Sequence, residues 1–256
     1  ELARIALEAP KELPKPKIRL ITTSGTPVYA GTERVLSETF GRPRFLSSGY
    51  ASNDTGPMGF QCEHCPNGTF HLQEELQILE IVKMDSDEVV EKGERGRMLF
   101  TSVLTRTLPV IRYEIGDIGR WLDEDGCPCG RVQPRFQLCG RSNDILVGEA
   151  SQLLPETVSN AVASVEGLSP EWQIKSYSVG DGEGLSLTCE TLPSVSLSEL
   201  NPETLREAFL QHARDLADDL HSGVVKELKV NIVRYGELPR SPRTGKITLF
   251  VDERKL

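Results

Sequence analysis

Two short pairs of cysteines constrain the fold of this chain more than any other feature of its sequence. Cys62 and Cys65 form a C-x-x-C pair in the segment CEHC, and Cys127 and Cys129 lie in the segment CPCGR. Because a C-x-x-C turn lets both thiolates reach one ion, a second pair on a neighbouring loop completes a tetrahedral shell, and soft thiolates favour zinc. The spacing therefore predicts a closed, structural zinc site that joins two loops distant in the sequence.

Two histidines leave the ligand set of this predicted site open. His64 lies inside CEHC and His71 follows it. Imidazole is also a zinc ligand, so either histidine could replace a cysteine, with His71 as the main alternative. Free thiols in two loops are the competing interpretation. The clustering favours a metal over a disulfide framework, and hence a reducing compartment, so we expect a cytoplasmic protein.

Composition and charge exclude several classes of protein. The chain has 256 residues, 38% of them hydrophobic, and a formal net charge of −9. This length suffices for one large domain or two ordinary ones. A net negative charge without a polybasic block argues against a nucleic-acid partner. No apolar run approaches the roughly 18 residues of a membrane span, and we expect no membrane partner.

The first half of the chain changes from an α/β to a β-rich pattern. Residues 18–22 and 44–48 have the composition of strands, and residues 27–41 between them are typical of a helix, with Gly41 at its end. This order predicts a βαβ unit with parallel strands. From Phe70 to Phe136, short strand-like runs alternate with Gly- and Asp-rich turns, which indicates a β-rich section, expected to be a small barrel.

The last part of the chain has a different order of helix-like and strand-like segments. Helix-like residues 155–165 precede strands at 172–180 and 185–192, one long helix over about 201–221 and a strand at 226–235. We predict a compact α/β domain over residues 143–256, after a larger domain over residues 1–142. The fold class is mixed α/β.

Four polar loops contain residues that could take part in binding or catalysis, although each also has an ordinary structural explanation. Ser24 or Thr26 in TTSGTP could simply cap a helix. Asp54 could hold Mg²⁺ or lie in a polar turn, and Asp117 could accept two ribose hydroxyls or belong to a common Asp turn. Lys246 in LPRSPRTGK could stabilise negative charge in a transition state or be a solvated turn lysine.

Taken in order, these loops resemble the motifs of adenylate-forming enzymes, the superfamily of acyl-CoA synthetases, adenylation domains and luciferases, and most closely the phenylacetate-CoA ligase branch. YASND at 50–54 is similar to Y-G-x-[ST]-E, and RYEIGDI at 112–118 to R-[YF]-x-[TI]-[GR]-D-[LI]. GRSNDILVGEASQLLP at 140–155 resembles G-R-S-D-D-M-[LI] and its continuation, and PRSPRTGK at 239–246 resembles P-R-[ST]-x-x-G-K. The cysteine loops resemble the zinc-binding insertion of some members.

The resemblance implies a nucleotide site in the larger domain. Tyr50 would stack on the adenine, Asp54 would replace the glutamate that holds Mg²⁺, and Asp117 would bind the ribose hydroxyls. The remaining members of the implied site lie along the adenine or close to the ribose: Ser24, Gly25, Thr26 and Arg141.

The resemblance also implies the reaction and its partners. Lys246 would bridge the acyl carboxylate and the α-phosphate, and Asn143 would be the hinge of a mobile C-terminal domain. A small-molecule carboxylic acid and ATP would give acyl-AMP and pyrophosphate, and a thiol would then form a thioester. The implied cofactors are ATP/AMP, Mg²⁺, structural Zn²⁺ and CoA.

Departures from the family pattern leave alternatives open. The family's Gly-rich loop for the β- and γ-phosphates does not occur in this sequence, so we expect the C-terminal portion of a longer enzyme, inactive without its missing N-terminal part. Glu149 and Ala150 lie where relatives have R-G-x-N, beside the path of the CoA arm. A carrier-protein thiol as acceptor, an enzyme that stops at acyl-AMP, and a catalytically inactive zinc-stabilised binding module remain alternatives.

Overall fold

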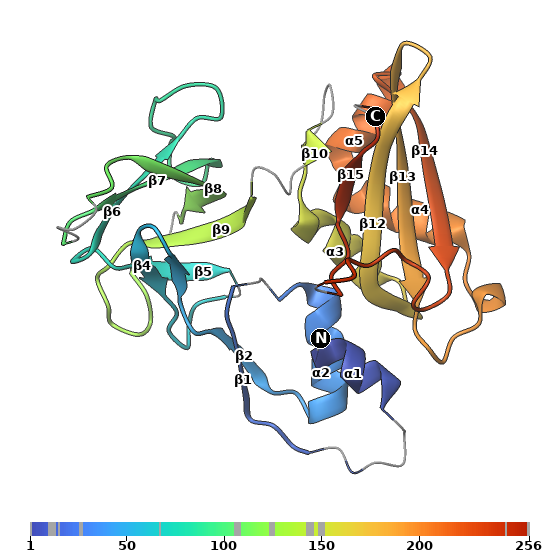
Figure 1. The fold of residues 1–256 in the computed structure, drawn as a ribbon, viewed down its shortest axis with the longest axis horizontal. Helices are drawn as coiled ribbons and strands as arrows, with labels where there is room; N and C mark the ends of the chain where they lie inside the picture. The colour runs from blue at the N-terminus through green and yellow to red at the C-terminus, as the bar shows by residue number, and fades with distance from the viewer. Residues whose placement is uncertain are drawn as a thin grey trace. The chain divides into compact units, whose positions relative to one another are not determined.

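The structure is a computed structural model (Figure 1) whose described residues divide into two compact units. Unit 1 comprises residues 1–17, 29–42 and 144–256, and unit 2 comprises residues 18–28 and 43–143. The predicted boundary at 142/143 remains a prediction. The structure describes residues 2–9, 14, 16–25, 28–66, 68–104, 109–122, 126–141, 146–147, 152–243 and 245–254.

The predicted strand–helix–strand order is present near the start of the chain. Strand β1 (Leu20–Thr23) pairs in parallel with β2 (Arg44–Ser47), and helix α2 (Ala30–Phe40) lies between them in sequence. Gly41 ends α2 in the left-handed region at φ 77°, and its N–H donates to the Ser37 carbonyl. Glycine is the residue that takes this conformation without strain, which explains why the sequence signal was reliable here.

Unit 2 contains a seven-stranded antiparallel sheet in the order β3-β4-β5-β9-β8-β7-β6. Its core contains aliphatic side chains and methionines together with four aromatic residues, Tyr50, Phe70, Phe100 and Phe136. The prediction of a β-rich section is confirmed. A closed barrel was wrong for the residues described, because β3 and β6 end the strand order and β3, with three residues, offers little to pair with. The strands are β3 (Tyr50–Ser52), β4 (Gly56–Phe60), β5 (Thr69–Leu72), β6 (Gln77–Val82), β7 (Gly96–Ser102), β8 (Tyr113–Trp121) and β9 (Arg135–Arg141).

Unit 1 is built on a four-stranded sheet in the order β14-β13-β12-β15, with helices α4 and α5 behind it in Figure 1. The β12–β13 pair is antiparallel, whereas β14 and β15 add in parallel on either side. Buried Trp172, Leu187 and Phe209 lie in its core. The elements are α3 (Pro155–Ser164), β12 (Leu168–Val179), β13 (Gly182–Thr191), η2 (Leu197–Glu199), α4 (Pro202–His212), α5 (Arg214–Ser222), β14 (Val225–Val233) and β15 (Phe250–Asp252).

The long helix predicted over about 201–221 is two helices. Ala213 leaves the helical region, with φ −111° and ψ 69°, and separates α4 from α5. Phe209 on α4 and Leu216 on α5 are both buried in the same core. Packing on the sheet therefore outweighs the continuous helical pattern of the sequence.

The remaining elements complete unit 1. Helices α1 (Leu2–Glu8) and α2 belong to it, and the Arg34 side chain of α2 donates to the carbonyls of Ala163 and Leu168 at 2.6 and 2.8 Å. Strands β10 (Leu146–Val147) and β11 (Gln152–Leu153) pair in antiparallel fashion. Among the described residues, no helix is long and apolar enough to cross a membrane.

Candidate functional site

The predicted metal ligands of unit 2 converge on one point. Cys62 Sγ lies 3.5 Å from the Sγ atoms of both Cys65 and Cys127, and Cys129 Sγ lies 3.6 Å from His71 Nε2. The ligand atoms of Cys62, His71, Cys127 and Cys129 all lie within 4.8 Å of one another. The sheet explains the convergence, because β5 pairs with β9 and so brings the β4–β5 loop beside the β8–β9 loop.

His71 has the environment of a metal ligand. Its ring stacks on Phe60 at a centroid distance of 5.1 Å, and its Nδ1 lies 3.3 Å from the Gln133 carbonyl. An Nδ1–H that donates to this carbonyl leaves the lone pair on Nε2, which faces Cys129. Burial lowers the pKa of His71 and favours the neutral ring. His64, in contrast, is exposed and lies 3.8 Å from the Glu63 carboxylate.

The thiols differ in how readily they ionise. Burial raises the pKa of Cys65 to about 11. Burial also acts to raise the pKa of Cys129, but the backbone N–H of Arg131 and neighbouring side chains outweigh it and lower this pKa to about 7. Thiolates are the metal-binding form, so the lowered pKa of Cys129 favours binding of a cation near neutral pH.

Three predicted nucleotide residues form a hydrogen-bonded group in unit 2. The buried Asp117 carboxylate on β8 accepts from Arg141 Nε at 2.9 Å through Oδ1 and from the Tyr50 hydroxyl through Oδ2. Asp117 and Arg141 are direct cross-strand partners of β8 and β9. We call Tyr50, Asp117 and Arg141 the Asp117 group.

The Tyr50 ring is itself part of the core. It is 9% exposed and packs against Phe70, Phe136 and Phe100 at centroid distances of 5.5, 5.8 and 6.0 Å. Burial, reinforced by the Asp117 charge, raises the pKa of Tyr50 far above its usual range, so its hydroxyl is a permanent donor. Stacking of this ring on an adenine remains a prediction.

The other predicted nucleotide residues are more exposed. Asp54 lies in the turn between β3 and β4, and its Oδ2 accepts from the Tyr113 hydroxyl at 3.1 Å. The hydrogen bond to Asp54 raises the pKa of Tyr113. Ser24 and Gly25 follow β1 and are exposed. Thr26 and the predicted hinge Asn143 lie outside the described residues.

Lys246 lies in unit 1 on a hairpin-like loop. The Ser241 N–H donates to the Lys246 carbonyl and the Gly245 N–H donates to the Ser241 carbonyl, both at 2.8 Å, and Arg240 pairs with Ile247. Gly245 takes a left-handed φ of 67°, which favours glycine at this position. The Lys246 residue is exposed.

Sequence reasoning missed the residue that anchors this loop. Glu190 is fully buried on β13 and forms an ion pair with Arg240. A glutamate inside the apolar run LTCETL is the signal that could have indicated it, because an acidic side chain in a buried strand needs a partner.

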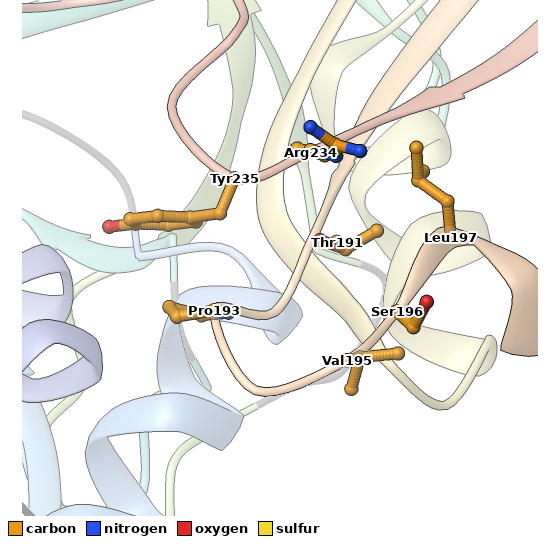
Figure 2. A pocket seen from close by; sticks show the side chains of 7 residues that line it. All are labelled: Thr191, Pro193, Val195, Ser196, Leu197, Arg234 and Tyr235. Atoms are coloured by element: carbon orange, nitrogen blue, oxygen red, sulfur yellow. The ribbon is translucent and has the colours of Figure 1, made fainter.

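A separate pocket of about 300 Å³ lies in unit 1, where the loop after β13 meets the residues that follow β14 (Figure 2). None of the predicted site residues that the structure describes lines it. Its lining is formed by Thr191, Pro193, Val195, Ser196, Leu197, Arg234 and Tyr235.

Solved structures show which proteins share this fold. The fold matches 2-hydroxyisobutyryl-CoA ligase, solved in the postadenylation state with R3-HIB-AMP, with a TM-score of 0.71 and 22% identity over 99% of this chain and 52% of that chain. The anthranilate CoA ligase AuaEII in complex with anthranoyl-AMP gives a TM-score of 0.61 at 17% identity, over 96% of this chain and 45% of that chain. The chain therefore has the fold of adenylate-forming CoA ligases.

Curated relatives narrow this class. Phenylacetate-coenzyme A ligase of Thermus thermophilus is 27% identical over 193 residues, 72% of this chain and 43% of the relative. The enzyme of that name from Escherichia coli is 29% identical over 177 residues, 69% of this chain and 38% of the relative. No family model matches the chain.

The resemblance to the phenylacetate-CoA ligase branch is thus confirmed. The chain spans about two fifths of the length of these curated relatives.

Proposed function

We propose that this chain is the C-terminal portion of an ATP-dependent acid–thiol ligase, which activates a small carboxylic acid as its acyl-adenylate and transfers the acyl group to CoA. The Asp117 group carries the proposal, because residues of three separate motifs meet in one hydrogen-bonded arrangement. Similarity to phenylacetate-CoA ligases over 72% of the chain supports it.

The Asp117 carboxylate can serve a ribose without losing its protein partners. An ionised carboxylate has about four lone-pair sites, two on each oxygen. Arg141 uses one site on Oδ1 and Tyr50 uses one on Oδ2, so within the described interactions each oxygen retains a site for one vicinal hydroxyl. Arg141 and Tyr50 would hold the carboxylate in the orientation that accepts both hydroxyls.

In the first chemical step a carboxylate attacks an anionic phosphate. The main requirement is therefore that the repulsion between these two negative groups is offset. Asp54 is an exposed carboxylate, and Mg²⁺ prefers one or two carboxylates with phosphate oxygens and water, so this residue fits a magnesium role. Bound Mg²⁺ would neutralise phosphate charge. The Lys246 ammonium would stabilise the charge that develops between carboxylate and α-phosphate.

Pyrophosphate release tests this proposal. The complete product of the gene is supplied with ATP, Mg²⁺ and a panel of aromatic and aliphatic acids, and pyrophosphate is measured with and without CoA. We expect release with at least one acid and a thioester when CoA is present. Lys246→Ala should slow release about 10²-fold or more.

The alternatives predict different results in the same assay. Release without a thioester, even with CoA, would indicate a carrier-protein acceptor or an enzyme that stops at acyl-AMP. If no acid supports release, the ligase proposal fails and the zinc-stabilised binding module is favoured. Release that is unchanged in Lys246→Ala would remove the role assigned to that lysine.

We also propose a structural zinc site in unit 2. Five donors compete for four tetrahedral positions, and the mutual distances favour Cys62, His71, Cys127 and Cys129, with Cys65 as the fifth. The donor set of thiolates and one imidazole suits zinc. Bound zinc would tie the β4–β5 loop to the β8–β9 loop and add no catalytic chemistry.

Metal analysis of purified variants tests the ligand set. Zinc should be lost in Cys62→Ser, Cys127→Ser and His71→Ala and retained in Cys139→Ser, a control in which a buried cysteine outside the group is changed. Retention in His71→Ala with loss in Cys65→Ser would assign the four-cysteine set instead. Retention in Cys62→Ser and Cys127→Ser alike would refute the site.

A further inference from the structure

The segment after Lys246 is anchored to strand β12 of unit 1. The Gln173 side chain donates to the Thr248 carbonyl, and the Ile174 N–H donates to the Leu249 carbonyl, both at 2.8 Å. Strand β15 then continues in parallel beside β12. These hydrogen bonds and the pairing of β15 with β12 therefore determine where the chain leaves the Lys246 loop.

The segment before Lys246 is anchored differently, by one carboxylate of strand β13. Glu190 Oε1 accepts from the Leu238 N–H at 2.8 Å and from Arg240 Nη1 at 2.9 Å. Its Oε2 accepts from Arg240 Nη2 at 3.0 Å. The Glu190 side chain is 0% exposed and that of Arg240 is 21% exposed. We call Glu190 and Arg240 the loop clamp.

The geometry of the loop clamp suits orientation more than stability. Burial of two charges costs free energy that their attraction only partly offsets, and an apolar pair of similar volume is often as stable. A bidentate pair of hydrogen bonds between guanidinium and carboxylate nevertheless fixes the plane and orientation of the arginine side chain. Because Arg240 pairs with Ile247, directly after Lys246, the clamp restrains both ends of the loop.

A second carboxylic acid near Arg240, that of Glu171, makes no hydrogen bond to the guanidinium. Glu171 Oε2 lies 3.9 Å from Arg240 Nη2, beyond hydrogen-bond distance, and burial raises the pKa of Glu171. Loss of the Glu190 charge would therefore leave Arg240 with the Leu238 carbonyl at 3.2 Å and the more distant Glu171 carboxylate as its described partners, and would leave the Leu238 N–H with a weaker acceptor.

We infer that Glu190 and Arg240 are positioning residues, which hold the Lys246 loop in the conformation that serves adenylation. This inference rests on the proposed function, since that proposal assigns Lys246 to the first half-reaction. The clamp should then matter for formation of the acyl-adenylate and not for its later reaction with the thiol.

A matched pair of variants tests the clamp. Glu190→Gln preserves the shape of the side chain and removes its charge. Glu183→Gln makes the same change at a second buried glutamate of β13, which pairs with Arg254 Nη1 at 3.0 Å and does not contact the Lys246 loop in any described interaction. Comparing the two variants separates loop positioning from the general cost of altering a buried ion pair.

The kinetic arm uses the complete gene product and follows the two half-reactions separately. Glu190→Gln should slow pyrophosphate release about 10²-fold, because small displacements of a charged catalytic group have effects of that size. Conversion of supplied acyl-adenylate and CoA into thioester should change less than about twofold, and Glu183→Gln should leave both steps near wild type. Equal slowing of both steps, or of neither, would overturn the inference.

The structural arm does not depend on activity. Hydrogen exchange at the Leu238, Ser241 and Gly245 amides should accelerate about tenfold or more in Glu190→Gln, because a hydrogen bond to a charged group is lost, and should be unchanged in Glu183→Gln. Unchanged exchange in both would refute the clamp. If the wild-type protein releases no pyrophosphate, the proposed function fails, and exchange alone decides whether Glu190 orders the loop.

Discussion

Replacing Tyr50 by phenylalanine isolates one hydrogen bond inside unit 2. The substitution preserves the ring that packs against Phe70, Phe100 and Phe136 and removes only the hydroxyl that donates to Asp117 Oδ2. Hydrogen bonds to charged groups contribute about 1.5–3 kcal/mol. We expect Tyr50→Phe to lower the free energy of unfolding of unit 2 by about that amount at neutral pH.

The same variant should change the alkaline limb of the stability curve. Burial raises the folded-state pKa of Tyr50 far above the value near 10 of an unfolded chain. Its contribution is therefore complete below about pH 10 and is lost as the pH rises from there towards the folded pKa, by at most about 1.4 kcal/mol per unit. The difference in the free energy of unfolding between wild type and Tyr50→Phe should therefore become smaller above about pH 10.

Tryptophan fluorescence can report on unit 2 alone. The chain has two tryptophans, Trp121 in unit 2 and Trp172 in unit 1, so a Trp172→Phe background leaves one reporter. Trp121 packs edge-on against Phe136 and lies beside the aromatic core. Urea unfolding at several pH values then gives the free energies of unfolding.

Tyr113→Phe is the control, because its exposed hydrogen bond to Asp54 should contribute less than about 0.5 kcal/mol. A loss below about 0.5 kcal/mol in Tyr50→Phe, or a gap that does not vary with pH, would refute the reasoning.

Three further perturbations have definite expected outcomes. A chelator that strips the proposed zinc should lower the unfolding midpoint reported by Trp121 and not the one reported by Trp172; equal shifts would contradict a site confined to unit 2. Gly96→Ala should destabilise unit 2 by at least about 1–3 kcal/mol in urea unfolding, since a Cβ there would lie 2.1 Å from the Val82 carbonyl oxygen, and a neutral result would argue against the β6–β7 packing. Asp117→Asn should raise the KM for ATP in the pyrophosphate assay; an unchanged KM would exclude ribose binding by this residue.

Local chemistry determined the elements that the sequence predicted well. The β1, α2 and β2 order follows from an apolar run, a helical pattern and Gly41, since glycine takes φ 77° at little cost. The motifs around Tyr50, Asp117 and Lys246 were also recognisable, because each is contiguous in sequence. Their resemblance to adenylate-forming ligases needed no knowledge of the strand order.

Tertiary structure decided how distant residues combine. His71 joins the cysteines because β5 pairs with β9, and the Tyr50 ring is buried by phenylalanines from other strands. Glu190 meets Arg240 only because the chain returns to β13 after β14. A residue pattern shows which side chains prefer burial and which need a partner. The strand order, which depends on many weak contacts between distant segments, decides which partner each of these side chains has.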